Sequence, residues 1–128
     1  MLNQGENIQF RRFETGATRD TDSGKFDYEG FICPFVLEEY AKYMHKCRVQ
    51  SDGNLRDSDN WQKGIPLKQY IKSLVRHLME VWMVWRGGKV HPKKETDPQN
   101  DLELMCAIMF NSMGYIHEKL KEKRANTN

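Results

Sequence analysis

Residues 66–88 decide the fold, and they read PLKQYIKSLVRHLMEVWMVWRGG. Their apolar side chains recur at the i, i+3, i+4 and i+7 positions that form one face of an α-helix. The pattern predicts a helix that begins near Pro66 and ends at the Gly87–Gly88 pair, because glycine commonly terminates helices. The periodic apolar positions are Leu67, Tyr70, Ile71, Leu74, Leu78, Val81, Trp82 and Trp85.

Two further helices are predicted on either side of this segment. Pro34 suits the first turn of a helix, and apolar residues continue from it at helical spacing to Cys47. A third helix is predicted over residues 100–121, where the apolar residues again keep helical register. Between the first two helices, residues 51–54 form a turn cluster and residues 56–64 form a loop.

The chain of 128 residues is close to the size of one domain, so we predict a single all-α domain over residues 1–128. Residues 1–33 show little periodicity, which predicts an extended segment or a short strand. Residues 1–12 and 121–128 are predicted to be flexible ends. Because 38% of the residues are apolar and 30% are charged, a small core supplemented by self-association fits the composition.

Charge and cysteine content narrow the class of protein. The net charge is only +2, from 20 basic and 18 acidic side chains, so no nucleic-acid partner is expected. The three cysteines lack a C-x-x-C pair, which is typical of buried or half-buried thiols in a reducing compartment. No segment resembles a signal peptide or a membrane span. These features predict a cytoplasmic protein that does not bind membranes.

Asn111 interrupts the apolar run of the third predicted helix. A helix that is apolar nearly all round is buried, so the amide is expected inside, where it needs hydrogen-bond partners. Two interpretations stay open. Asn111 is either a structural amide that caps or bridges a neighbouring helix, or a ligand-facing amide at the floor of a cavity.

His77 and Glu80 are three residues apart in the second predicted helix and therefore share a face. A half-buried imidazole and carboxylate are able to hold a divalent metal ion or to polarise water. The structural alternative is a local His–Glu hydrogen bond at the edge of the helix.

Other charged residues have weaker signals. Glu38 and Glu39 open the first predicted helix, where the helix dipole alone favours acidic residues. Phosphate chemistry requires several cations around one pocket, although each cation by itself is usually a solvated surface charge. The candidate cations are Arg19, Lys25, Arg56, Lys63 and Arg76.

Several common sites are excluded by their missing motifs. The chain has no G-x-x-x-x-G-K-[ST] phosphate loop, no G-x-G-x-x-G and no G-x-S-x-G nucleophile elbow. No histidine is followed by aspartate, which argues against the HD type of phosphohydrolase, and the histidines lack metalloprotease spacing.

Residues 13–118 carry an ordered set of motifs, which consists of GATRD at 16–20, GKFDYEG at 24–30, DNWQKGIP at 59–66, Arg76 with His77, and Asn111. Each motif is weak alone, but the ordered set is fairly specific. The set resembles the phage-encoded dATP/dGTP diphosphohydrolases.

The resemblance implies a MazG-like helical bundle with an irregular N-terminal segment, in the class of all-α nucleoside triphosphate pyrophosphohydrolases. Such proteins assemble as dimers or tetramers and bind Mg²⁺ or Mn²⁺ through acidic residues on two neighbouring helices. The implied reaction converts dGTP or dATP into dGMP or dAMP and pyrophosphate. In phages that replace adenine with 2-aminoadenine, a similar enzyme supplies dGMP as the precursor of the modified nucleotide.

The chain departs from the E-x-x-E and E-x-x-D pairs of the MazG pattern, which leaves two sets of metal ligands open. The preferred set consists of Glu38, Glu39, His77 and Glu80. The alternative set consists of His77, Glu80, Asp101, Glu103 and Asn111. The first is preferred because Asp101 and Glu103 resemble the acids that the first turn of a helix favours.

The resemblance also implies roles around the nucleotide. Glu38 and Glu80 are predicted as ligands or catalytic bases, and His77 as a ligand or as the group that orients one. Trp61 is predicted to stack on the purine, or alternatively to cap the core, and Asn60 to bind the edge of the base. Lys25, Lys63 and Arg76 are predicted to bind the phosphates. Asp27 is predicted to bind either the sugar or a metal ion. The predicted substrate-binding residues are Arg19, Lys25, Asp27, Asn60, Trp61, Lys63, Arg76 and Asn111.

Two other functions stay open. The first is a non-catalytic phage accessory protein that binds nucleic acid or a host protein. The aromatic residues fall mostly at core spacing rather than among lysines and arginines, which disfavours nucleic-acid binding. The second is a structural helical module whose Trp82 and Trp85 end serves as an oligomer interface.

Overall fold

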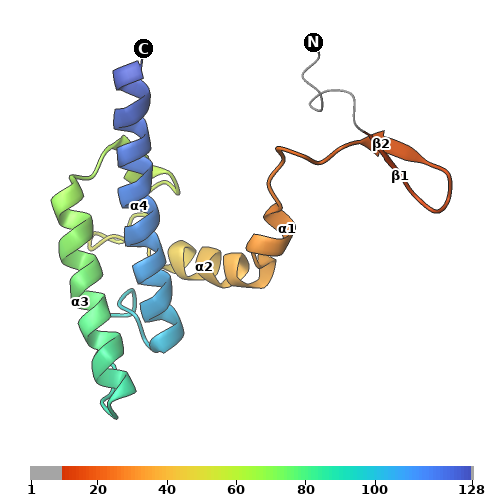
Figure 1. The fold of residues 1–128 in the computed structure, drawn as a ribbon. Coiled ribbons are helices and arrows are strands. Elements are labelled where there is room, and N and C mark those ends of the chain that lie inside the picture. Colours follow the sequence, from red (N-terminus) through yellow and green to blue (C-terminus); the bar gives the residue numbers. More distant parts are fainter. Residues whose placement is uncertain (1–9, 128) are drawn as a thin grey trace. The chain divides into compact units, whose positions relative to one another are not determined.

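The computed structural model describes residues 10–127, and within them the chain is mainly helical (Figure 1). The chain divides into two compact units, one that ends at Cys33 and one that begins at Pro34. The predicted helical class is confirmed, with one small two-stranded sheet beside the helices. Among the described helices, none combines the length and the hydropathy that crossing a membrane requires.

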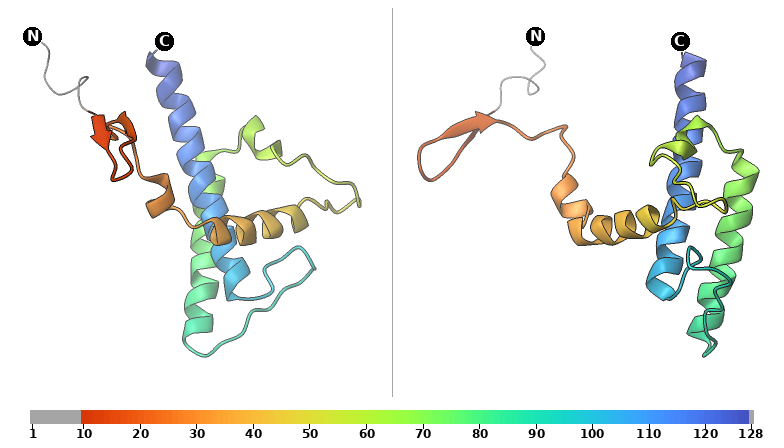
Figure 2. Two further views of the ribbon diagram at one scale, coloured as in Figure 1. Left: turned by 90° about the vertical axis from the view of Figure 1, so that its right-hand side faces the viewer. Right: turned by 180° about the vertical axis from the view of Figure 1, so that it is seen from behind.

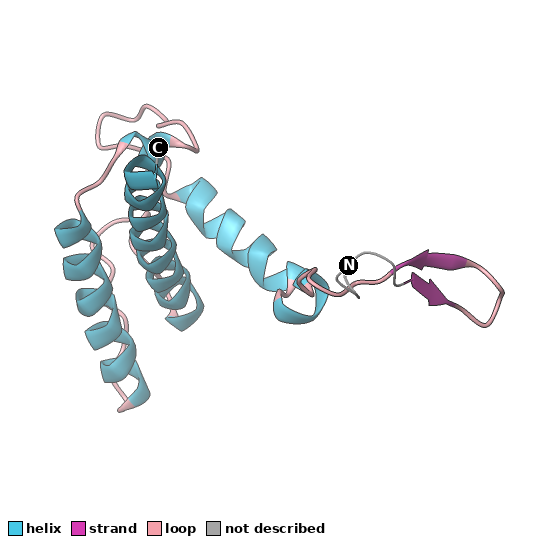
Figure 3. Ribbon diagram, turned by 45° about the horizontal axis from the view of Figure 1, so that its top comes forward, coloured by secondary structure: helices cyan, strands magenta, loops and turns pink. Residues whose placement is uncertain are grey.

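The first unit holds a β-hairpin and a single helical turn (Figure 3). β1 (Phe10–Arg12) pairs antiparallel with β2 (Thr18–Asp20), which confirms the predicted short strand. α1 (Tyr28–Phe31) was not predicted, because four residues are too few to show helical periodicity. Asp27 caps it by accepting a hydrogen bond from the backbone N–H of Gly30 at 2.9 Å.

The second unit contains the three predicted helices and a short 3-10 helix. They are α2 (Pro34–Lys46), η1 (Asn60–Lys63), α3 (Leu67–Trp85) and α4 (Asp101–Thr127). Figure 2 shows α3 and α4 running antiparallel beside each other, with α2 crossing α4. The helix prediction ended at residue 121, but α4 continues to Thr127. Its last turns contain good helix formers and i, i+3 ion pairs, such as Glu118 with Lys121 at 3.3 Å.

The core of the second unit is small and lies where α2 and α3 each meet α4. Tyr43 on α2 packs against Cys106 and Ala107 on α4 in one buried cluster. On the other side, the ring of Tyr70 is 1% exposed and lies directly over Gly114 of α4. A Cβ at Gly114 would overlap this ring, so the missing side chain is what lets α3 approach α4 so closely.

Much of the predicted apolar face of α3 is exposed rather than buried. Ile71, Leu78 and Trp82 are each about half exposed, and Trp85 is 85% exposed. The thiol predictions have a mixed outcome as well. Cys106 is buried and Cys47 is half-buried, as predicted, but the prediction is wrong for Cys33, which is exposed in the first unit.

Candidate functional site

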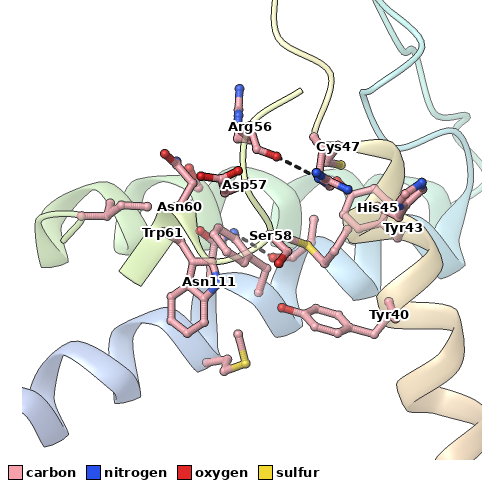
Figure 4. A pocket seen from close by; sticks show the side chains of 18 of the residues that line it. Tyr40, Tyr43, His45, Cys47, Arg56, Asp57, Ser58, Asn60, Trp61 and Asn111 are labelled. Atoms are coloured by element: carbon pink, nitrogen blue, oxygen red, sulfur yellow. Dashed lines mark hydrogen bonds between the residues drawn. The ribbon is translucent and has the colours of Figure 1, made fainter. Parts of the chain in front are cut away.

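A cavity of about 560 Å³ opens within the second unit, a size typical of small-molecule sites (Figure 4). Its lining comes from α2, the loop over residues 48–58, η1 and one face each of α3 and α4. Most of the wall is apolar, with a few polar side chains among the aromatic and thioether groups. Four predicted site residues line this cavity, Asn60, Trp61, His77 and Asn111, and so does Arg56, one of the candidate cations.

Asn111 lines the cavity from α4 and is only 4% exposed, which confirms the predicted buried amide. Its Nδ2 donates a hydrogen bond to the backbone carbonyl of Ala107, one helical turn earlier, at 2.8 Å. Among residues 10–127, the amide makes no hydrogen bond to a neighbouring helix. It is held by its own helix and lines the cavity.

Trp61 and Asn60 reach the cavity from η1. The half-buried indole makes edge-to-face contacts with Phe110 and His117 of α4, with ring centroids 6.3 Å and 4.7 Å away. These contacts fix the ring against α4 and leave it in the cavity wall, so Trp61 caps part of the core and is still placed to meet a ligand.

His77 and Glu80 form the pair that their spacing predicted. Nδ1 of His77 lies 3.0 Å from Oε1 of Glu80, and their side chains are 16% and 35% exposed. His77 lines the cavity, whereas Glu80 lies behind it on the same face of α3. The hydrogen bond at the helix edge is therefore present, and it orients an imidazole that belongs to the cavity wall.

A hairpin-like loop brings two arginines to the cavity that sequence reasoning did not pair. Val49 and Leu55 form an isolated antiparallel bridge around the turn at residues 51–54. Arg48 Nε donates to the carbonyl oxygen of Arg56 at 2.8 Å, and the backbone N–H of Arg56 donates back to Arg48 at 2.9 Å. Both arginines line the cavity.

The signal for this pairing was present in the sequence. A Ser-Asp-Gly-Asn turn predicts a reversal of the chain, and Arg48 and Arg56 lie on either side of it. Other lining residues, such as Tyr40 and Met44 of α2, carried no signal beyond core spacing. The further polar lining residues that were not predicted are His45, Asp57, Ser58 and Ser73.

The other predicted residues of the second unit lie outside the cavity lining. Arg76 is exposed on α3, and its guanidinium donates to Ser73 at 3.2 Å, while Lys63 is exposed on η1. Glu38 and Glu39 are exposed on α2, and their carboxylates lie 3.8 Å and 3.9 Å from Nζ of Lys42. None of these four residues lines the cavity.

Arg19, Lys25 and Asp27 belong to the first unit. Arg19 is an exposed residue of β2, and Lys25 is exposed in the turn that follows. Asp27 has a local role as the cap of α1. Their predicted contacts with a nucleotide stay predictions.

Within residues 10–127, no three His, Cys, Asp or Glu side chains lie close enough to share one metal ion. The preferred ligand set instead occupies two separate places, Glu38 and Glu39 on α2 and the His77–Glu80 pair on α3. Glu103 of the alternative set accepts from the backbone N–H of Gln99 at 3.1 Å and pairs with Lys46. Glu103 is therefore a first-turn acid that caps α4, as its position predicted.

Burial changes the acidity of groups beside the cavity. Desolvation raises the pKa of Tyr40 to about 12, and nearby Cys106 and Tyr70 add to the shift. The Tyr40 hydroxyl is buried and has no hydrogen-bond partner among the described residues. Burial also raises the pKa of the Cys47 and Cys106 thiols. These groups stay neutral at physiological pH, so the cavity wall on this side carries no negative charge from them.

Comparison with known proteins gives one family. The sequence model of the family described as dATP/dGTP diphosphohydrolase, N-terminal, matches residues 15–128. The match covers most of the chain and all of the second unit. No curated protein and no solved structure gives a significant match.

Proposed function

The chain belongs to the dATP/dGTP diphosphohydrolase family, and on that premise we propose that its cavity binds and hydrolyses purine deoxynucleoside triphosphates. The proposed products are dGMP or dAMP and pyrophosphate. The observation that carries the proposal is the content of one cavity of about 560 Å³. It brings together an indole, two amides, two imidazoles and two guanidiniums, which are groups that suit the binding of a nucleotide.

The base is proposed to lie between Trp61 and the floor around Asn111. An aromatic side chain recognises the flat face of a purine, and amides recognise its hydrogen-bonding edge. Asn60, beside Trp61, supplies a second amide on the η1 side of the cavity. The apolar residues of the same wall, such as Phe110 and Met113, would exclude water from the base.

The phosphates are proposed to lie at Arg48 and Arg56. Guanidinium groups bind phosphate oxygens through two parallel hydrogen bonds, and this geometry makes arginine common at phosphate sites. Neither arginine forms an ion pair with a carboxylate among the described residues. This assignment adds two cations to the proposed phosphate contacts of Lys25, Lys63 and Arg76, which the cavity lining does not include.

His77 is proposed to act as the general base, oriented by Glu80. Its hydrogen bond through Nδ1 leaves Nε2 as the ring nitrogen available to accept a proton from water. The oxygen of that water forms a bond to the α-phosphorus, the bond from the α-phosphorus to the bridging oxygen breaks, and pyrophosphate leaves with the electron pair. The arginine charges offset the charge that develops on the leaving group.

A requirement for Mg²⁺ or Mn²⁺ is proposed from the family resemblance alone. The donor groups of one described chain do not fit such an ion, because the acidic residues of α2 and α3 occupy separate places. The proposed steps therefore use only His77 with its partner Glu80 and the two arginines of the cavity. Loss of turnover on adding EDTA, restored by excess Mg²⁺ or Mn²⁺, would support the requirement, and unchanged turnover would contradict it.

The protein is further proposed to form a homo-oligomer through α3 and α4. Each helix carries an exposed apolar stripe at the 3–4 residue spacing of helix–helix interfaces. On α3 the stripe consists of Ile71, Val75, Leu78, Trp82 and Trp85, and on α4 of two parts, Leu102 with Met105, and Met113, Ile116 and Leu120. A second copy of the chain has matching stripes, so it is the proposed occupant of this surface.

The test of the proposed reaction is product analysis. Pure protein is incubated with each deoxynucleoside and ribonucleoside triphosphate and with Mg²⁺ or Mn²⁺, and the products are separated by chromatography. Appearance of dGMP or dAMP together with pyrophosphate supports the proposal and ranks the bases. Appearance of orthophosphate with a diphosphate places the cleavage at the wrong bond, and survival of every triphosphate overturns catalysis. A supply of dGMP for a modified purine nucleotide in a phage is the proposed role of such a reaction.

A further inference from the structure

Asn111 keeps a hydrogen-bond acceptor without a partner at the wall of the cavity. The residue is 4% exposed, and its Nδ2 is bound to the carbonyl oxygen of Ala107 at 2.8 Å. Among the described residues, no group donates a hydrogen bond to its Oδ1. The oxygen is not among the fully enclosed polar atoms that lack a partner, so it keeps access to the cavity that Asn111 lines, where a bound molecule is able to donate to it.

The hydrogen bond to Ala107 distinguishes the nitrogen of the Asn111 amide from its oxygen. Rotating the amide by half a turn would place Oδ1 against the carbonyl oxygen of Ala107, and two acceptors cannot share a hydrogen bond. The oxygen is therefore the end directed away from that carbonyl. Figure 4 shows the amide beside Trp61 and across the cavity from Tyr40, so a base stacked near the indole would meet it.

The apolar surroundings of Asn111 Oδ1 mean that a bound ligand has to supply its hydrogen-bond donor. Phe110, Met113 and Met44 line the same cavity and offer it no donor. A ligand that excludes water without supplying a donor would leave the oxygen desolvated and unpaired. Such a mismatch typically lowers affinity by about tenfold to a hundredfold. Sites built around a buried polar group reject analogues that lack its partner more strongly than apolar pockets reject a missing methylene.

We propose that Asn111 selects the base by accepting a hydrogen bond from one of its amino groups, an inference that rests on the function proposed above. Adenine offers its N6 amine, and guanine offers its N2 amine and the adjacent N1–H. A purine of the same shape without the amino group is bound and hydrolysed less well. Asn111 is thus the residue that determines specificity for aminopurines at this site.

The experiment compares dATP with purine 2′-deoxyriboside triphosphate, which lacks only the N6 amino group. The wild-type protein is expected to favour dATP by about tenfold or more in kcat/KM. In Asn111→Leu, which has a similar volume but no acceptor, this ratio falls to about one. The matched pair dGTP and dITP, which differ only in the N2 amine, gives the same comparison for guanine.

The outcomes separate this inference from the proposed reaction. If the wild-type protein hydrolyses both members of each pair equally well, the inference is overturned and the proposed reaction stands. If no triphosphate is hydrolysed, the proposed reaction fails, and equilibrium binding of the same pairs decides the inference. Tighter binding of the amino-bearing member that Asn111→Leu abolishes supports it, whereas equal binding or none overturns it. Because an equal wild-type ratio overturns the inference by itself, the inference can be refuted without any variant.

Discussion

The Nδ1 atom of His77 lies 3.0 Å from Oε1 of Glu80, and of the two residues only His77 lines the cavity. A carboxylate that holds one ring nitrogen fixes the tautomer and orientation of the imidazole, and so prepares the other nitrogen for proton transfer. The relationship follows the logic of catalytic pairs in which one group acts and a second group orients it.

We expect His77→Gln to lower kcat by about 10²- to 10⁴-fold, the contribution typical of a positioned general base. Glu80→Ala is expected to abolish most turnover, because the imidazole loses its orientation. Steady-state rates of pyrophosphate release measure both effects. Helical circular dichroism and oligomer size should match the wild type, and a loss of folding in Glu80→Ala would instead give that residue a structural role.

Arg56→Gln is expected to raise KM for dGTP and to lower kcat/KM by about tenfold or more, because a charge-assisted hydrogen bond to phosphate is lost. Lys68→Gln is the matched control, since Lys68 is exposed on α3 and outside the cavity lining. If Lys63→Gln and Arg76→Gln cost more activity than Arg56→Gln, the phosphates lie at the positions that the sequence predicted.

Gly114→Ala is expected to destabilise the protein by about 1–3 kcal/mol, the usual cost of overpacking a core. The added methyl group would overlap the ring of Tyr70, so α3 and α4 must separate. Urea denaturation measures the change, and Ser112→Ala on the same helix serves as the control. Adding Tyr70→Leu to Gly114→Ala should restore part of the loss, and an unchanged midpoint in Gly114→Ala alone would refute the close contact.

Thiol labelling with a disulfide reagent at pH 8 should distinguish the three cysteines. Cys33 is exposed and is expected to react first, whereas burial raises the pKa of Cys47 and Cys106 and lowers their thiolate populations. Cys33→Ser should therefore remove the fast phase. Equal rates for all three thiols in the folded protein would contradict the observed burial.

Alkaline pH is expected to lower the free energy of unfolding, because burial raises the pKa of the Cys47 and Cys106 thiols in the folded protein. Burial also raises the pKa of Tyr43, so the folded state holds its protons at a pH where the unfolded chain has lost them. Stability is then complete below the ordinary thiol pKa of 9.0 and is lost as the pH rises above it. Urea midpoints at pH 7, 9 and 10 test the sign, and a rising midpoint would contradict it.

Leu78→Glu is expected to dissociate the proposed oligomer, because a charge is placed in the middle of the exposed apolar stripe of α3. Gln69→Glu makes a similar change in charge at another exposed position of the helix. Sedimentation equilibrium at micromolar concentration gives the masses. A monomeric wild-type protein under these conditions would contradict the proposed homo-oligomer.

The sequence by itself determined the local elements of this protein. Apolar spacing and the breakers Pro34 and Gly87 located the three long helices, because helix formation depends on contacts within a few turns. Spacing also placed His77 and Glu80 on one face, and the apolar run around Asn111 predicted its burial. These conclusions required no knowledge of how the helices pack.

Only the tertiary structure decided which faces meet and which residues share the cavity. Along α3 two adjacent apolar stripes have similar composition, and packing against α4 buries Tyr70 while it leaves Ile71 exposed. The meeting of Arg48 and Arg56 depends on a chain reversal, and their approach to Asn111 depends on contacts between α2 and α4. Such long-range contacts are set by the packing of whole helices, which periodicity along the chain does not encode.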